Sequence, residues 1–162
     1  LDDNQFSGNI PEKLYDLINL EYLYLFNNNF SGNITSSIGK LTKLKEIMLN
    51  NNNFSGNLPN ELFQLNLLTG IWAQNNNFSG EISFEINNLN FLKHLNLQNN
   101  NFSGTITSGL CDLDLPYNNL DSTYVWSGDG NSWNFFNLTN NSFCSELPLC
   151  ITQEDIGEQN CP

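Results

Sequence analysis

The chain has 162 residues, 39% of them hydrophobic, and seventeen acidic residues against five lysines give it a formal charge of −12. This excess of negative charge disfavours nucleic acids and anionic membrane surfaces as partners. No apolar run approaches the roughly 18 residues that a membrane-spanning helix needs, so we expect no direct membrane insertion.

The chain is organised by a repeat of 24 residues. Its most regular element is the tripeptide Phe-Ser-Gly, which begins at Phe6, Phe30, Phe54, Phe78 and Phe102. Before each later Phe, apolar residues occupy alternate positions, as in Leu23 and Leu25. Alternation with a period of two predicts a short strand with one apolar side. Repeats of this length bury that side only against their neighbours, so we expect a stack of coils.

The segment that follows each Phe-Ser-Gly also repeats its apolar positions. The set Ile34, Ile38, Leu41 and Leu44 recurs 24 residues later as Leu58, Leu62, Leu65 and Leu68. Both segments therefore point side chains into the stack, and we expect the returns to be irregular or short helical.

An asparagine stands two residues before each Phe and continues into the last coils. We predict that this column is structural, because stacked amides can satisfy backbone groups that an inward bend leaves unpaired. The predicted ladder consists of Asn28, Asn52, Asn76, Asn100, Asn118 and Asn141.

The combined pattern, N-x-F-S-G-x-I/L-P, is seen in Asn4 to Pro11 and Asn52 to Pro59. It resembles the plant-type extracellular leucine-rich repeat, although Thr35, Ser83 and Thr107 replace the proline. The resemblance covers nearly the whole chain. It implies an α/β-type repeat solenoid, a curved right-handed coil stack with a parallel sheet on its concave face and mostly irregular or short helical convex returns.

The repeat spacing divides the chain into three parts. Residues 1–110 form regular repeats, which we expect to be N-terminally truncated or uncapped because Leu1 aligns with the strand residue Leu25. In residues 111–143 the spacing changes, and we predict a shortened coil with a strand at Leu113 and Leu115, followed by a looped coil. Residues 144–162 form a C-terminal cap.

All four cysteines, Cys111, Cys144, Cys150 and Cys161, lie in the last third of the chain. An even, clustered number predicts disulfides and hence an extracellular or cell-surface location. Four cysteines allow three pairings. The resemblance to plant-type caps, in which two nearby cysteines pair, favours Cys144 with Cys150 and Cys111 with Cys161.

The side chains between the buried strand positions should face solvent on the concave sheet. Its first half is aromatic and its second half is polar and acidic, a combination that suits protein or glycan ligands. A bland interpretation is that the first aromatics merely cover an end coil. The candidate ligand-binding residues are Tyr22, Tyr24, Phe26, Glu46, Met48, Trp72, His94, Asn96, Asp112 and Asp114.

No group of residues predicts chemistry, so we expect neither enzyme activity nor a cofactor. His94 is the only histidine and cannot form a metal cluster by itself. Asp112 and Asp114 would share one strand face, but a calcium site needs six or more oxygens and a glycosidase needs a cleft. Seven N-x-S/T sequons permit glycosylation: Asn29, Asn33, Asn53, Asn77, Asn101, Asn137 and Asn140.

We therefore expect a non-enzymatic recognition module that binds protein or carbohydrate through its concave face. The alternative is a structural element of a surface fibre that stacks end to end, so that either a monomer or self-association is possible. Ice binding ranks below both. It needs a regular outward row, and the row Asn9, Asn33, Asn57, Glu81 and Thr105 is interrupted by its Glu.

Overall fold

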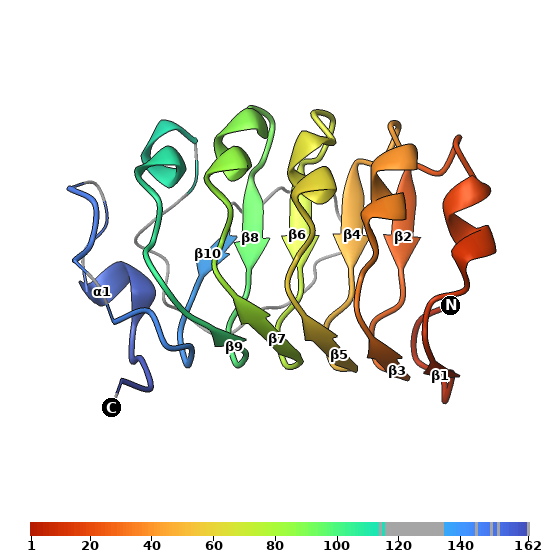
Figure 1. The fold of residues 1–162 in the computed structure, drawn as a ribbon, viewed down its shortest axis with the longest axis horizontal. Coiled ribbons are helices and arrows are strands. Elements are labelled where there is room, and N and C mark those ends of the chain that lie inside the picture. Colours follow the sequence, from red (N-terminus) through yellow and green to blue (C-terminus); the bar gives the residue numbers. More distant parts are fainter. Residues whose placement is uncertain (114, 116–134, 145, 150, 152, 162) are drawn as a thin grey trace.

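The computed structural model describes residues 1–113, 115, 135–144, 146–149, 151 and 153–161. Successive coils stack along the long axis of the molecule and contribute their strands to two parallel sheets (Figure 1). The main sheet contains β2 (Tyr22–Tyr24), β4 (Glu46–Met48), β6 (Gly70–Trp72), β8 (His94–Asn96) and β10 (Phe135–Asn137). This architecture confirms the predicted repeat solenoid.

A second parallel sheet, which the sequence did not predict, runs along the lower edge of Figure 1. It is formed by β1 (Ser7–Gly8), β3 (Asn29–Gly32), β5 (Asn53–Gly56), β7 (Asn77–Gly80) and β9 (Asn101–Phe102). The Phe-Ser-Gly motif contributes residues to each of these strands, and its glycine has a positive φ, for example 75° at Gly56. An L side chain rarely adopts that backbone conformation, which explains why glycine recurs there.

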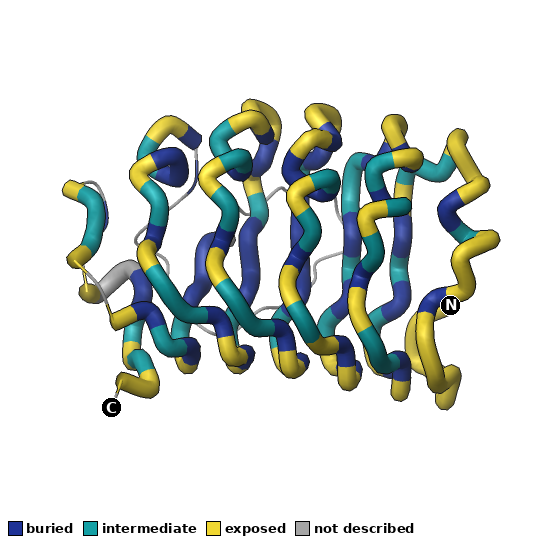
Figure 2. Tube along the Cα trace, in the orientation of Figure 1, coloured by how far each residue is buried: buried dark blue, intermediate teal, exposed yellow. Residues whose placement is uncertain are grey.

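The returns are short 3-10 helices, as expected, and the chain ends with one helical turn. They are η1 (Glu12–Asp16), η2 (Ser36–Lys40), η3 (Asn60–Gln64), η4 (Phe84–Asn88), η5 (Ser108–Asp112) and α1 (Gln153–Ile156). Each of the middle returns buries an aliphatic side chain, such as Ile38 or Leu62. Figure 2 shows the buried positions along the upright strands and the exposed ones at the bends.

The phenylalanines of the repeat form a continuous column of stacked rings inside the molecule. The ring centroids of Phe30 and Phe54 lie 6.0 Å apart, as do those of Phe54 and Phe78. Phe78 and Phe102 continue the column at 6.1 Å. Because every coil adds one ring at the same position, the core extends along the stack and has no centre.

The buried asparagines join each coil to the preceding one. The Asn76 Oδ1 atom accepts the N–H of Phe54 at 2.9 Å, while its Nδ2 donates to the carbonyls of Leu49 and Ala73 at 3.0 and 3.2 Å. The same bonds recur at Asn28, Asn52, Asn100 and Asn141. The predicted ladder position Asn118 lies outside the described residues.

A second asparagine column, on the surface, was not recognised in the sequence. Its members have positive φ and each donates its amide to the corresponding side chain one coil earlier, as Asn75 does to Asn51 at 2.6 Å. Asparagine tolerates this left-handed conformation better than most residues do. The column consists of Asn27, Asn51, Asn75, Asn99 and Asn140.

The prediction of two irregular coils before the cap is wrong in its strand order. Strand β10 pairs directly with β8, with Phe136 opposite Leu95, so no strand at Leu113 and Leu115 lies between them. The amide of Asn140 donates directly to the Asn99 side chain, 41 residues earlier, so these two asparagines are neighbours in the exposed column. The alternation Leu113, Leu115 resembled a strand, but it follows η5 and the two leucines are buried outside the sheet.

The predicted disulfide pairing is also wrong, because Cys144 bonds Cys161. The cap returns in parallel beside the last coil, where Asn141 pairs with Gln159 and the N–H of Asn160 donates to the carbonyl of Asn141 at 2.6 Å. This pairing brings residue 161 next to residue 144. Cys111 is disulfide-bonded too, and no described cysteine is free.

Candidate functional site

The outward face of the main sheet is defined by its register. Leu23, Ile47, Ile71 and Leu95 face the core and are buried, so their neighbours along each strand face away from it. The parallel pairing places Tyr24, Met48, Trp72, Asn96 and Asn137 in one row across the strands. The predicted binding residues of the first four strands therefore do share one face.

The N-terminal end of this face carries a cluster of three aromatic rings, which we call the aromatic cluster: Tyr22, Tyr24 and Phe26. The Tyr22 and Tyr24 centroids lie 6.0 Å apart in an edge arrangement, and those of Tyr24 and Phe26 lie 6.5 Å apart. Tyr22 is 48% exposed, and the Tyr24 hydroxyl donates to the carboxylate of Glu46. The cluster thus combines exposed apolar area with a fixed geometry.

A charged pair borders the aromatic cluster. The Lys45 ammonium lies 2.7 Å from the Glu21 carboxylate and 5.8 Å from the centroid of the Tyr22 ring. Its hydrogen bond and charge lower the pKa of Glu21, and the carboxylate in turn raises the pKa of Lys45. Both groups are solvated, so the pair contributes little to folding stability but keeps both charges beside the rings.

Trp72 is buried, contrary to the expectation that it stands outward. Only 6% of it is exposed. Its indole lies across Gly70, where a Cβ atom would collide with the six-membered ring, and stacks on His94 with centroids 5.0 Å apart. The missing side chain at Gly70 provides the space. Trp72→Ala would therefore disturb packing as well as any binding, and it cannot separate the two.

Three buried polar atoms of Trp72, Gln74 and His94 lack a partner among the described residues. The Trp72 Nε1, Gln74 Oε1 and His94 Nδ1 atoms are buried and have no hydrogen bond in the described part of the chain. Burial, with a smaller contribution from Lys93, lowers the pKa of His94 to about 4. His94 is thus neutral in the folded protein at neutral pH.

The lowered pKa predicts that folding stability falls on acidification. A histidine in the unfolded chain has a pKa near 6.5, so between about pH 6.5 and 4 the unfolded state binds more protons and is favoured as the pH decreases. Lowering the pH from 7 to 5 should reduce the free energy of unfolding by about 1 kcal/mol more in the parent than in His94→Gln, once solvent screening of the partly buried ring is allowed for. Chemical denaturation at both pH values measures the difference. Equal losses in parent and variant would contradict it.

The polar half of the predicted site is largely occupied by internal bonds. The buried Asn96 accepts the N–H of Gln98 through its Oδ1 atom. The buried Asn137 donates its amide to Gln98 Oε1 and accepts the Thr139 N–H at 2.9 Å. Asp112 belongs to η5 and not to a strand, so its placement on this face is wrong, and Asp114 lies outside the described residues.

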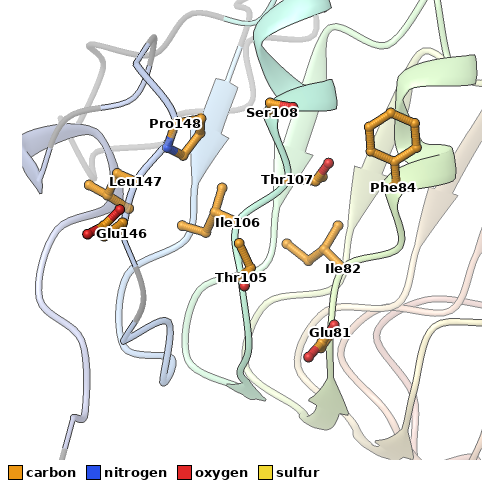
Figure 3. Close-up of a pocket in the computed structure, with 10 residues that line it drawn as sticks. All are labelled: Glu81, Ile82, Phe84, Thr105, Ile106, Thr107, Ser108, Glu146, Leu147 and Pro148. Carbon is orange, nitrogen blue, oxygen red and sulfur yellow. The ribbon is translucent and has the colours of Figure 1, made fainter.

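A separate hollow of about 560 Å³ lies on the flank of the molecule, away from the main sheet (Figure 3). Its lining comes from the segments after β7 and β9 and from cap residues 146–148, and includes the carboxylates of Glu81 and Glu146. Within the described residues, no cluster of three or more His, Cys, Asp or Glu side chains could hold a metal ion. Nor does any helix there have the length and apolarity to cross a membrane.

Comparison with known proteins identifies the repeats of this chain as leucine-rich repeats. The family model described as Leucine Rich Repeat matches residues 19–41, 43–65 and 91–113. No curated protein sequence matches the chain.

Among solved structures, the chain is similar to the Arabidopsis receptor kinase HAESA, whose structure contains the peptide hormone IDA and the co-receptor SERK1. The two share 33% identity with a TM-score of 0.73, over 87% of this chain and 21% of that one. A chain of the Arabidopsis thaliana BIR3–SERK2 complex shares 34% identity with a TM-score of 0.65, over 68% and 59% of the chains. The BIR2 ectodomain from the same plant shares 32% identity with a TM-score of 0.64, over 65% and 56%. The present chain thus spans from a fifth to about three fifths of these structures.

Proposed function

Because the chain is a leucine-rich repeat protein of the plant extracellular type, we propose that it is a non-enzymatic module that recognises a peptide or protein. The proposed contact surface is the aromatic cluster together with Met48 on the main sheet. The single observation that carries this proposal is the partly exposed cluster of contacting rings on a face that the fold does not need to keep apolar. Aromatic side chains supply large contact area at low entropic cost.

Similar structures support a protein ligand. The HAESA structure includes a peptide hormone and a co-receptor, and that of BIR3 includes SERK2. These partners belong to those proteins, which extend beyond the segment shared with this chain. They also support an extracellular or cell-surface location, in keeping with the Cys144 and Cys161 disulfide.

The geometry favours a protein over a carbohydrate. Sugar recognition would draw on free planar amides beside the rings, yet the amides of Asn96 and Asn137 are buried. The remaining surface offers apolar rings bordered by Lys45 and Glu21, one charge of each sign. Apolar anchors within a polar rim are typical of protein interfaces.

The test uses a peptide obtained by selection on the protein itself. A random dodecapeptide library displayed on phage is selected on the immobilised chain, and one recovered peptide is titrated by calorimetry. Tyr22→Ala should weaken this peptide by roughly tenfold or more, about 1.4 kcal/mol, because the ring supplies much of the exposed contact area.

The matched control is Phe84→Ala, since Phe84 is also an exposed aromatic, 61% accessible, but belongs to η4 on the return side. It should bind as the parent does, and both variants should keep the parent's thermal midpoint. If the selected peptides bind Phe84→Ala more weakly than the parent but bind Tyr22→Ala as tightly as the parent, the binding site does not lie on the main sheet.

A further inference from the structure

The seven sequons of this chain occupy different structural settings, which the sequence alone does not distinguish. Four belong to the repeat motif, are exposed, and are the first residues of β3, β5, β7 and β9: Asn29, Asn53, Asn77 and Asn101. Asn33 lies in the segment that joins β3 to η2, Asn137 is the last residue of β10, and Asn140 follows that strand. Only an asparagine whose amide can project into solvent is compatible with an attached glycan in the folded chain.

Asn137 fails this condition although its sequon, Asn-Leu-Thr, is complete. It is 4% exposed, and its Nδ2 atom donates to Gln98 Oε1. Its Oδ1 atom accepts both the N–H and the hydroxyl of Thr139, at 2.9 and 2.8 Å, so the sequon threonine itself holds the amide inward. A glycan on this nitrogen would break these bonds and would have to displace the neighbouring coil.

Asn33 meets the condition better than the equivalent residues of other coils. In its column, Asn9 and Asn57 turn their amides over the glycine of the next coil, where a Cβ atom on Gly32 or Gly80 would collide with them. At Gly56, only the Cβ atom of Asn33 comes within 4 Å, at 3.4 Å. The Asn33 amide is therefore directed away from the next coil, and the residue is exposed.

We propose that Asn33 is an N-glycosylation site and that Asn137 stays unmodified in the folded protein, an inference that rests on the extracellular location proposed above. The donor is an oligosaccharide linked to a lipid pyrophosphate. The Asn33 Nδ2 atom bonds to the anomeric carbon and loses one proton, while the bond from that carbon to the pyrophosphate oxygen breaks and the lipid pyrophosphate leaves. Thr35 completes the sequon.

The placement of the exposed sequons also fits the proposed binding face. Asn33 and the four repeat asparagines lie on the second sheet or the segment that follows it, and the exposed Asn140 lies beyond the end of β10 (Figure 1). None of these six lies on β2, β4, β6 or β8. Glycans there would cover the flank and leave the aromatic cluster open. The sequon asparagine that lies within the main sheet, Asn137, is buried.

The experiment is site mapping on protein secreted from insect cells. The folded monomer is treated with a peptide N-glycosidase in ¹⁸O-labelled water, digested with chymotrypsin and analysed by mass spectrometry. We expect ¹⁸O-labelled aspartate at position 33 and none at 137, and the intact mass of Asn33→Gln should fall by one glycan. Asn57→Gln is the matched control, because this residue has the same place in its coil but no sequon, and its glycan mass should not change.

Either of two results would overturn the proposal: label at 137 in the folded protein, or an unmodified Asn33 in protein that the same cells secrete. Titration of Asn33→Gln with the selected peptide separates this inference from the proposed function. We expect Asn33→Gln to bind the peptide as the parent does. If the glycosylation inference fails, the glycan is absent but the peptide still binds; if the proposed function fails, peptide binding does not depend on Tyr22.

Discussion

Asn76→Leu should lower the free energy of unfolding by about 3 kcal/mol. The Phe54 N–H has the Asn76 Oδ1 atom as its side-chain acceptor inside the core, and leucine of similar size offers none. The carbonyls of Leu49 and Ala73 each lose one of two amide donors but keep Asn52 or Asn100 as the other. One orphaned buried donor and two weakened acceptors together give the expected cost, which urea denaturation measures.

The neighbouring residue provides the control. Asn75 belongs to the exposed column, has a φ of 58° and bonds Asn51 at the surface. Asn75→Gly removes this solvated bond and the one that Asn75 accepts from Asn99, but it relieves the left-handed backbone, so stability should stay within about 0.5 kcal/mol of the parent. If the two variants lose equal stability, the buried ladder has no special role.

The features predicted well from the sequence are those that every coil repeats. The Phe30, Phe54 and Phe78 spacing defines the coil length, and the buried asparagines follow from the need to pair backbone groups at an inward bend. Both depend on residues within one repeat and its neighbour. The second sheet escaped prediction because Phe-Ser-Gly has too few alternating positions to indicate a strand.

The features predicted poorly depend on contacts that do not repeat. Trp72 occupies an outward register position, but the absence of a side chain at Gly70, two residues earlier, lets the indole fold down onto the sheet. Asp112 was assigned to a strand from the alternation of Leu113 and Leu115, whereas it belongs to η5 and β10 pairs directly with β8. Each error concerns a position where one neighbour decides the outcome.

The cap disulfide should stabilise the folded C-terminal end of the stack by about 3 kcal/mol. Cys144 and Cys161 are 17 residues apart, and closing a loop of this length removes about that much chain entropy from the unfolded state. Because a repeat stack is held by nearest-neighbour contacts, replacing both cysteines by serine should open the cap before the central coils. The Asn140 N–H, which donates to Glu158 at 2.7 Å, and the Asn160 N–H should exchange with solvent faster by up to two orders of magnitude.

Hydrogen exchange followed by mass spectrometry distinguishes local opening from general loss of stability. The amide of Asn51, bonded to the carbonyl of Gln74 in the central coils, should keep its parent exchange rate in the double serine variant. Ser142→Ala is the matched control, since it removes a hydroxyl that donates to the cap carbonyl of Asn160 at 3.3 Å and leaves the disulfide intact. It should leave both regions near the parent rates. If Asn51 and Asn140 instead accelerate together in the serine variant, the stack unfolds as one cooperative unit, and the cap does not open independently.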